Sequence, residues 1–455
     1  IKMIRCQCQL NMFCILFSEA RNLTKHPYQD LLLILHHTFD DVLDCLLFFP
    51  QCFYRLKNVA LNVFLLLPDS LILKICYKLR KVSGLKLRLK QKSLICGNYL
   101  AGLIMSDLLK VGISIGDVNG IGLEVIMKTL SESEVYKYCT PIVYGHTKVA
   151  SFHRKIAGIQ EFIFQVINDA SQAHQGKPNM INCWEEDVKI ELGTNNHNGG
   201  KYAFLSLQRA TDDLVKGKID ALVTAPINKH NIQSETFKFS GHTEYVQAMS
   251  GAPDSLMFLI SNTLKVGVVT GHVPLKDVAA NITQESILSK LRLMNKSLKY
   301  DFWIEKPKIA VLGLNPHAGD DGLIGQEELE IILPAIEKAK QEGIFAFGAY
   351  PADGFFGNRT FDQFDAILAM YHDQGLIPFK SLSFHHGVNF TSGLPVVRTS
   401  PDHGTGYDIA GKNMASASSF RDALFEACHI VKRRREQQQL VDNTLAFTRH
   451  SRDRD

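Results

Sequence analysis

The chain has few cysteines and little net charge once its first hundred residues are set aside. Seven of its ten Cys precede residue 105. The three that follow, Cys139, Cys183 and Cys428, are too few and too scattered for a disulfide framework. The formal net charge is only +4 over 455 residues, which excludes a strongly basic or strongly acidic protein. We therefore expect a protein of the reducing cytoplasm.

Long uninterrupted apolar runs are also lacking. The two most apolar stretches, residues 31–49 and 59–77, are interrupted by charges such as Asp40, Asp44 and Asp69. A spanning helix needs about 20 mostly apolar residues with few charges. A secretory signal begins with a short basic region and one compact apolar core, and this chain does not. We therefore expect no membrane association.

Glycine is scarce at the start of the chain, where only three of the 32 Gly precede residue 105. The same segment holds 14 Lys and Arg against 6 Asp and Glu, and shows neither a sustained helical stripe nor strand alternation. The chain opens on Ile, while Met105 directly precedes the first well-formed strand. We therefore expect residues 1–104 to be an extension outside the functional fold.

From Lys110 onward, short apolar runs that end in Gly, Asp or His alternate with longer amphipathic segments, which is typical of an α/β protein. The expected strands are residues 111–115, 141–145, 221–224, 264–270, 308–314 and 365–370. The expected helices are residues 200–216, 284–298, 325–342 and 418–432. The last helix continues into a basic run without interleaved aromatics, so we expect no nucleic-acid site.

Two turns at predicted helix starts could receive an anion. Residues 116–122 form a glycine-rich turn between a strand and a helix, but they do not match the G-x-G-x-x-G fingerprint. Glycines there let the backbone approach either a ligand or a neighbouring element. His242 and Thr243 lie at another helix start, where free N–H groups meet a phosphate oxygen or a capping side chain. The spacing leaves both alternatives open for each turn.

Three predicted strands each deliver a histidine just past their carboxyl end. These are His272, His317 and His372. α/β proteins bind ligands at the carboxyl ends of their strands. Three nitrogen donors with an open remaining position form a recognised catalytic metal site. A single such histidine is usually structural, but three in the same relative position favour a metal site.

Polar and basic residues follow the third of these histidines at regular spacing. Lys380, Asn389 and Arg398 lie nine residues apart, downstream of the pair His372 and Asp373. A buried strand gains nothing from polar or charged groups at its end, whereas a ligand does. We therefore expect these groups to hold an anion beside the metal.

Four motifs together resemble one family. They are Gly116-Asp117-x-x-Gly120-Ile121-Gly122-x-Glu124 and residues 240–244, 315–319 and 371–375. The chain resembles the 4-hydroxythreonine-4-phosphate dehydrogenase family of pyridoxal phosphate biosynthesis. The likeness runs from about residue 110 to residue 431, in the expected order, and does not touch residues 1–104.

The resemblance implies an α/β fold with two α/β/α subdomains and a cleft between them, of the isocitrate and isopropylmalate dehydrogenase type. It also implies a homodimer whose active site is shared between subunits. The expected organisation is thus an extension at residues 1–104, a two-lobed body with interleaved lobes at 105–435, and a polar tail at 436–455.

The activity implied by the resemblance is an oxidation that depends on NAD and on a divalent metal, either Zn, Mg or Co. The substrate is 4-phosphooxy-L-threonine, oxidised to 2-amino-3-oxo-4-phosphooxybutanoate and then decarboxylated to 3-amino-2-oxopropyl phosphate. One alternative is a related dehydrogenase of D-threonate or D-erythronate 4-phosphate. A phosphate acyltransferase of related architecture is a second, against which the three histidines argue. The sequence leaves open the metal, the choice of NAD over NADP, and the general base.

The resemblance also assigns roles to individual residues. The metal ligands are His272, His317 and His372. The substrate contacts are His242, Thr243, Lys380, Asn389 and Arg398. The candidate catalytic groups are Lys380, Asp353 and Asp373. Residues 402–412 are similar to the cofactor loop of isocitrate and isopropylmalate dehydrogenases, and the NAD contacts in them are His403, Gly404 and Asp408.

A truncated chain that begins at Met105 tests the expected extension. We expect it to fold and to keep the activity of the full chain, because every motif lies downstream of residue 105. Circular dichroism and an activity assay of both chains check this. Loss of folding or of activity in the shorter chain would show that residues 1–104 belong to the functional protein.

Overall fold

The computed structural model describes residues 108–159, 161–383 and 386–442. The predicted extension at 1–104, with its two apolar stretches, lies outside the described residues, as do residues 443–455. No helix within the described ranges is long and apolar enough to cross a membrane.

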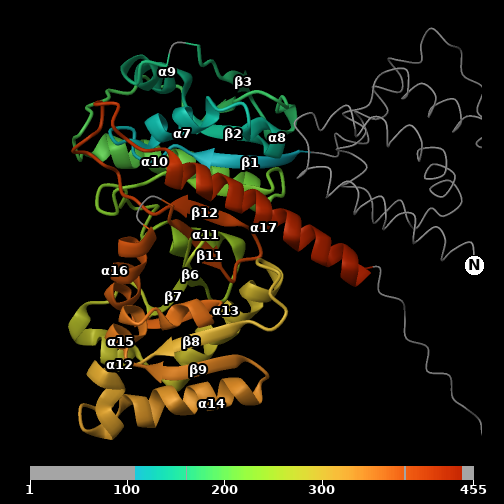
Figure 1. Ribbon diagram of the computed structural model, residues 1–455. Coiled ribbons are helices and arrows are strands. Elements are labelled where there is room, and N and C mark those ends of the chain that lie inside the picture. Colours follow the sequence, from blue (N-terminus) through green and yellow to red (C-terminus); the bar gives the residue numbers. More distant parts are fainter. Residues whose placement is uncertain (1–107, 160, 384–385, 443–455) are drawn as a thin grey trace, which may run out of the picture. The chain divides into compact units, whose positions relative to one another are not determined.

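A 12-stranded mixed sheet forms the centre of the described part (Figure 1). Its strand order is β3-β4-β2-β1-β5-β12-β11-β6-β7-β10-β8-β9. In chain order the strands are β1 Leu109–Ser114, β2 Cys139–Gly145, β3 Gln165–Ile167, β4 Asn179–Asn182, β5 Ala221–Thr224, β6 Leu256–Ile260, β7 Lys265–Thr270, β8 Lys308–Leu312, β9 Phe345–Tyr350, β10 Ala366–Tyr371, β11 Val388–Ser392 and β12 Arg398–Pro401.

Helices connect the strands and cover both faces of the sheet. They are α7 Gly122–Leu130, α8 Val135–Tyr138, α9 Thr147–Ile156, α10 His197–Val215, α11 His242–Ser250, α12 Val278–Asn281, α13 Gln284–Tyr300, α14 Leu333–Gln341, α15 Ala352–Gly357, α16 His372–Ser383 and α17 Ser418–Asp442. A π-helical turn at Glu328–Ile332 leads into α14. The short 3-10 turns that matter for the site are η3 Leu275–Asp277 and η4 Pro316–Gly322.

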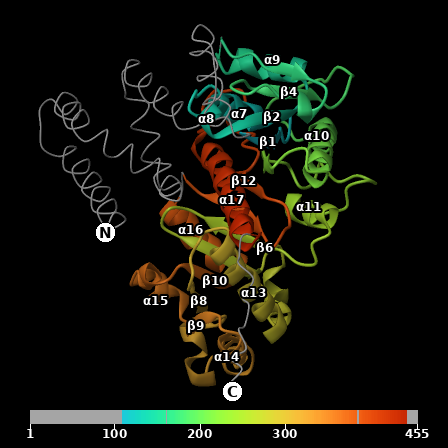
Figure 2. The same ribbon diagram turned by 90° about the vertical axis from the view of Figure 1, so that its right-hand side faces the viewer.

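The first lobe contains β3, β4, β2, β1, β5 and β12, which run parallel to one another. Ile142 and Leu222 pack on the face covered by α10, whereas Val111 and Ile113 pack on the face of α7 and α17. Helix α17 lies across β12 (Figure 2). A parallel sheet covered on both faces requires strands that are apolar along their length, which is why β1, β2 and β5 were predicted from the sequence. The short strands β3, β4 and β12 were not predicted.

The second lobe contains β7, β10, β8 and β9, again parallel. Leu368 and Val311 pack toward α13 and α14, whereas Ile367 and Leu312 pack toward α15 and α16. The antiparallel strands β11 and β6 join the two lobes. The predicted α/β class with two lobes is confirmed, and the structure adds that both lobes share one sheet.

Side-chain caps set the starts of the two longest central helices. The Asn196 side chain accepts a hydrogen bond from the Gly199 amide at 3.0 Å, and α10 begins directly after it. Thr283 and Ser286 form a reciprocal capping box at the start of α13. Such caps satisfy amides that have no partner within the helix. They explain why these helices begin at His197 and Gln284.

The C-terminal helix is longer than predicted. The sequence pattern ended it at Lys432, but α17 continues through Asp442 and includes part of the predicted polar tail. The added residues are mostly Arg, Glu, Gln and Leu, which are strong helix formers. Arg434 also anchors this part, because its Nε lies 2.6 Å from Oδ1 of the buried Asp301. The point where the amphipathic pattern ends in the sequence therefore underestimates the length of this helix.

Gly200 tests the packing of α10 against the loop after β5. A Cβ at this position would lie 2.0 Å from the Asn231 carbonyl oxygen, although Ala is the better helix former. We expect Gly200→Ala to lower the free energy of unfolding by about 1–3 kcal/mol because the backbone must shift. Urea denaturation measures it.

Gly354→Ala on α15 is the matched control, because nothing lies within 4 Å of the position that its new methyl group would occupy. We expect this variant to be as stable as the wild type or up to about 1 kcal/mol more stable. Equal stability of the Gly200→Ala protein and the control would contradict the close packing of α10.

Candidate functional site

The three strands that precede the histidines are direct neighbours. β10 pairs in parallel with β7 on one side and with β8 on the other. Their carboxyl ends therefore lie at one edge of the sheet, as the sequence predicted. His272 lies just past β7, His372 opens α16 directly after β10, and His317 lies in η4 after β8.

His272 and His372 are brought together, with ring centroids 6.0 Å apart. Each has a carboxylate near Nδ1. His372 Nδ1 lies 2.7 Å from Asp373 Oδ1, and His272 Nδ1 lies 3.9 Å from Glu244 Oε1. A carboxylate at one ring nitrogen orients the imidazole so that the other nitrogen can face a ligand. In His272 that other nitrogen, Nε2, contacts Lys229 Nζ at 2.8 Å, so a metal ion would have to displace this lysine. This donor chemistry fits two ligands of one divalent metal ion.

His317 does not join the other two histidines within the chain. It is exposed and has a left-handed backbone with φ 54°, as do Ala318, Asp320 and Asp321. Non-glycine residues rarely adopt this conformation, and such strain gathers at functional sites. Among the described residues, no three His, Cys, Asp or Glu side chains form a group that could hold a metal ion. One chain therefore supplies two of the three predicted ligands at one place.

Lys229 is a site residue that the sequence interpretation missed. Its Nζ lies 2.8 Å from His272 Nε2, and burial lowers the pKa of its ammonium group. It follows the buried strand β5 in the same way that the histidines follow theirs. That signal was present in the sequence. Glu244 was also missed as a site residue, and its contact with His272 lowers the pKa of its carboxyl group.

Arg398 is a buried cation that forms no ion pair with any acidic residue in the described part of the chain. The residue is only 2% exposed. The guanidinium donates to the hydroxyls of Thr224 at 3.1 and 2.5 Å, Thr391 at 3.2 Å and Thr243 at 3.4 Å. No carboxylate of the described chain lies within ion-pair distance of it. Burial lowers its pKa to about 10, so it stays charged at neutral pH. A buried, unpaired guanidinium is costly and favours binding of an anion.

Several buried polar atoms of the predicted site residues and of Glu244 have no hydrogen-bond partner among the described residues. They include His242 Nε2, Glu244 Oε2, Asn389 Oδ1 and His403 Nε2. Burial lowers the pKa of His242 well below its usual value, and the Arg398 and Lys229 cations lower it further. Its imidazole is therefore neutral at pH 7. Unsatisfied buried atoms are rare in native proteins and point to a ligand that completes them.

The predicted lysine and acids are placed differently. Lys380 lies on α16, with its Nζ 3.4 Å from Asp402 Oδ1, and burial raises the pKa of Asp402. Asp373 contacts His372. Asp353 lies exposed in the first turn of α15, and no hydrogen bond or ion pair among the described residues joins it to the histidines.

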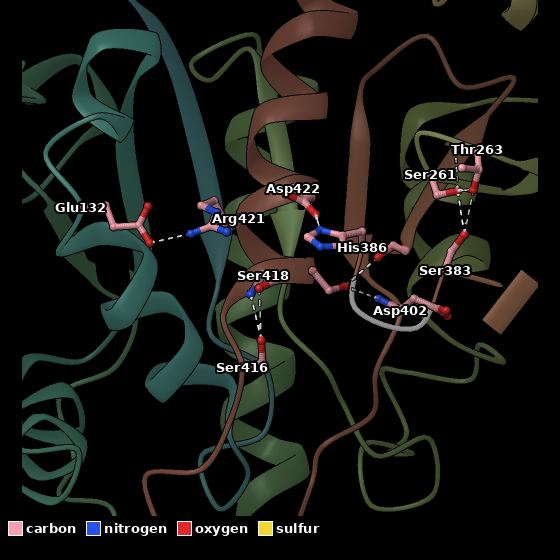
Figure 3. Close-up of polar contacts among 12 residues, drawn as sticks. Glu132, Ser261, Thr263, Ser383, His386, Asp402, Ser416, Ser418, Arg421 and Asp422 are labelled. Atoms are coloured by element: carbon pink, nitrogen blue, oxygen red, sulfur yellow. Dashed lines mark hydrogen bonds and ion pairs between the residues drawn. The ribbon is translucent and has the colours of Figure 1, made fainter. Parts of the chain in front are cut away.

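Residues 402–412, called the cofactor loop here after their predicted role, run from β12 toward α17. The Asp402 amide donates to Ser419 Oγ at 3.0 Å, and Ser419 Oγ donates to the Gly387 carbonyl at 2.6 Å (Figure 3). Burial lowers the pKa of His403, whereas Asp408 is exposed. Gly404 has open space beside it. α17 thus fixes the start of the loop, whereas Gly404 and Asp408 are exposed.

Comparisons with known proteins agree on one family. Residues 137–427 match the family described as pyridoxal phosphate biosynthetic protein PdxA. A 4-hydroxythreonine-4-phosphate dehydrogenase of Bacteroides thetaiotaomicron is 49% identical over 338 residues, which cover 74% of this chain and 93% of that protein. A relative of the same name from Aquifex aeolicus is 44% identical over 315 residues, covering 69% and 96%.

Solved structures give the same result. A 4-hydroxythreonine-4-phosphate dehydrogenase from Burkholderia phymatum is 37% identical with a TM-score of 0.60, and the match covers 71% of this chain and 99% of that one. The corresponding structure from Klebsiella pneumoniae is 33% identical with a TM-score of 0.62, covering 72% and 98%. The resemblance found in the sequence is confirmed, and with it the expectation of an oxidoreductase: the chain belongs to the pyridoxal phosphate biosynthetic protein PdxA family.

Proposed function

We propose that the protein is a 4-hydroxythreonine-4-phosphate dehydrogenase that uses NAD and a divalent metal ion. It oxidises the secondary hydroxyl of 4-phosphooxy-L-threonine, and the resulting 3-oxo acid loses CO2 to give 3-amino-2-oxopropyl phosphate. The observation that carries the proposal is the buried guanidinium of Arg398, which is bonded to threonine hydroxyls and forms no ion pair within the described residues. It suits a substrate that carries both a phosphate and a carboxylate.

The anionic groups of the substrate would be held by cations from three elements. Arg398 offers a planar fork of N–H donors, which matches a phosphate or carboxylate. Lys380 on α16 and Lys229 after β5 add further cations. Neutral His242 and the unpartnered Asn389 Oδ1 would fix the orientation of the substrate. These roles retain the predicted substrate contacts and add Lys229.

The metal ion would be held by His272 and His372 of one chain and by His317 of a second copy. The 6.0 Å pairing of the first two histidines and the exposed, left-handed turn at His317 support this arrangement. When bound, a divalent ion supplies Lewis-acid polarisation of the substrate oxygens. Of the three candidates for proton transfer, Asp373 contacts His372, whereas Lys380 contacts Asp402 and Asp353 is exposed.

Exposed apolar side chains support a homodimer at the same edge of the sheet. Leu275 in η3 is 76% exposed, Leu323 after η4 is 81% exposed and Ile377 on α16 is 64% exposed. Each of them follows one of the three histidines in the chain. Exposed large apolar residues mark interaction surfaces when they gather around a site. A second copy seated there would cover them and bring its own His317 to the histidine pair.

One assay separates the candidate activities. NADH formation is measured by absorbance with 4-phosphooxy-L-threonine, D-threonate 4-phosphate and D-erythronate 4-phosphate, each with and without a chelator, and CO2 release is followed in parallel. We expect NADH and CO2 from the first compound, loss of both with the chelator, and recovery on adding Zn, Mg or Co. If kcat/KM is higher for either D-acid than for 4-phosphooxy-L-threonine, that D-acid is the substrate instead. Absence of NADH with all three compounds would overturn the dehydrogenase proposal for this chain.

A substitution at His317 tests the metal site. We expect His317→Ala to lower turnover by at least about 100-fold and to weaken metal binding, because a ligand is lost. The fold should persist, since His317 is exposed. Equilibrium dialysis of metal and circular dichroism measure these effects. His429→Ala is the control, because His429 is a partly exposed histidine of α17 that is not among the site residues. Unchanged metal-dependent activity in His317→Ala would remove this residue from the site.

Co-expression of two inactive variants tests whether the site is shared. In a hybrid of His317→Ala and His372→Ala subunits, one of the two sites contains only intact residues. Random pairing in a two-fold dimer then restores about a quarter of wild-type activity. Activity no higher than that of either variant alone would show that each chain builds its own site.

A further inference from the structure

The glycine-rich turn at 116–122 and helix α7 contact the cofactor loop rather than open space. We infer that Asp117, together with Tyr407 and Asn231, is a positioning group that fixes the cofactor loop relative to the metal and substrate residues. This inference rests on the proposed use of residues 402–412 in binding NAD, and it deepens that proposal.

Asp117 is a buried carboxylate satisfied by neutral donors. It is 1% exposed and lies just past the end of β1. Its Oδ2 accepts hydrogen bonds from the Tyr407 hydroxyl at 2.6 Å and from Asn231 Nδ2 at 2.8 Å. Its Oδ1 accepts from the Asn119 amide at 2.8 Å. No lysine or arginine of the described chain forms an ion pair with it. A buried carboxylate held by several donors is strongly oriented, because losing any of them is costly.

The backbone of the turn reinforces this contact. The Ile121 amide donates to the Thr405 carbonyl at 3.0 Å. A Cβ on Gly120 would lie 2.7 Å from the same oxygen, so only glycine allows this approach. Gly406, with φ +57°, packs against Ile121. Of the two alternatives that the spacing left open for this turn, the structure thus shows close approach to a neighbouring element.

Helix α7 contacts the chain just past the end of the loop. Glu124 Oε1 accepts from the Ala415 amide at 3.0 Å and from Lys128 Nζ at 2.8 Å. Lys128 Nζ also donates to the Ala415 carbonyl at 2.8 Å. The Asp402 amide is bound to Ser419 at the other end (Figure 3). The motif at 116–124 therefore contacts the loop in its middle and just past its end, while α17 fixes its start.

Asn231 connects this assembly to the other side of the site. Its Nδ2 contacts Asp117 and also lies 3.4 Å from the Tyr407 hydroxyl. The loop after β5, to which Asn231 belongs, also carries Lys229, whose Nζ is 2.8 Å from His272 Nε2. The Tyr407 hydroxyl is thus connected to His272 through Asn231 and the short stretch of backbone between Asn231 and Lys229. Hydride transfer requires the cofactor and the substrate carbon in a fixed relative position, and this network provides a physical connection between their two loops.

Tyr407→Phe tests the inference, because it removes one hydroxyl and keeps the ring. We expect faster hydrogen exchange of residues 403–411 in the protein without cofactor. We also expect the Kd of NADH and the KM of NAD to rise about tenfold, the effect of one hydrogen bond to a charged group. The KM of the phosphorylated substrate should stay within about twofold. Exchange mass spectrometry, NADH fluorescence and steady-state kinetics measure these quantities.

Tyr136→Phe is the matched control. Its hydroxyl also makes a 2.6 Å hydrogen bond, to the Leu130 carbonyl, in the same lobe but away from the cofactor loop. We expect neither the exchange of residues 403–411 nor the Kd of NADH to change in this variant. A similar rise in both variants would show a general loss of stability rather than a positioning role.

Two results would overturn the inference. The first is unchanged loop exchange in Tyr407→Phe, which is measured without any cofactor and so does not depend on the proposed function. The second is faster loop exchange with unchanged NADH affinity, which would leave the contacts without a role in cofactor binding. A wild-type protein that binds no NADH would instead overturn the proposed function, and the inference with it.

Discussion

The site depends on one electrostatic constraint, the burial of the Arg398 guanidinium with no carboxylate of the described residues at ion-pair distance. Removing a cation from water costs several kcal/mol unless an anion or good hydrogen bonds replace the solvent. Threonine hydroxyls on β5, β11 and α11 supply those hydrogen bonds, but they supply no negative charge. The same charge helps to keep His242 neutral. This charge distribution favours an anionic ligand.

The strand that carries Arg398 also leads to the cofactor loop. β12 ends at Pro401, and Asp402 follows directly, bonded through its amide to α17 and approached by Lys380 from α16. One short strand therefore relates the buried guanidinium, the lysine and the loop to one another. The antiparallel strands β11 and β6 then join this part to the strands that carry His272 and His372. A single continuous sheet gives these groups a common rigid support.

Much of the fold was predictable because parallel strands covered on both faces must be apolar throughout. The strand at 221–224 was predicted with its observed bounds, and the helix predicted from Gln284 begins there. Other elements were missed or misjudged. β11 and β12 are short and partly polar, so Asn389 and Arg398 were recognised by spacing but not placed in strands. The end of α17 was underestimated although its residues are strong helix formers, because it is also anchored by ion pairs with residues far away in the chain.

The sequence by itself determined which residue types follow the buried strands, and its motifs identified the family. Only the tertiary structure decided which of them meet. His272 and His372 come together because β7 and β10 are neighbours in the sheet, whereas His317 is held apart by a left-handed turn. Strand order also brings Lys229 to His272 and the turn at Asp117 to Tyr407. These contacts join residues separated by tens to hundreds of positions, so the packing of the sheet sets them and local sequence periodicity does not.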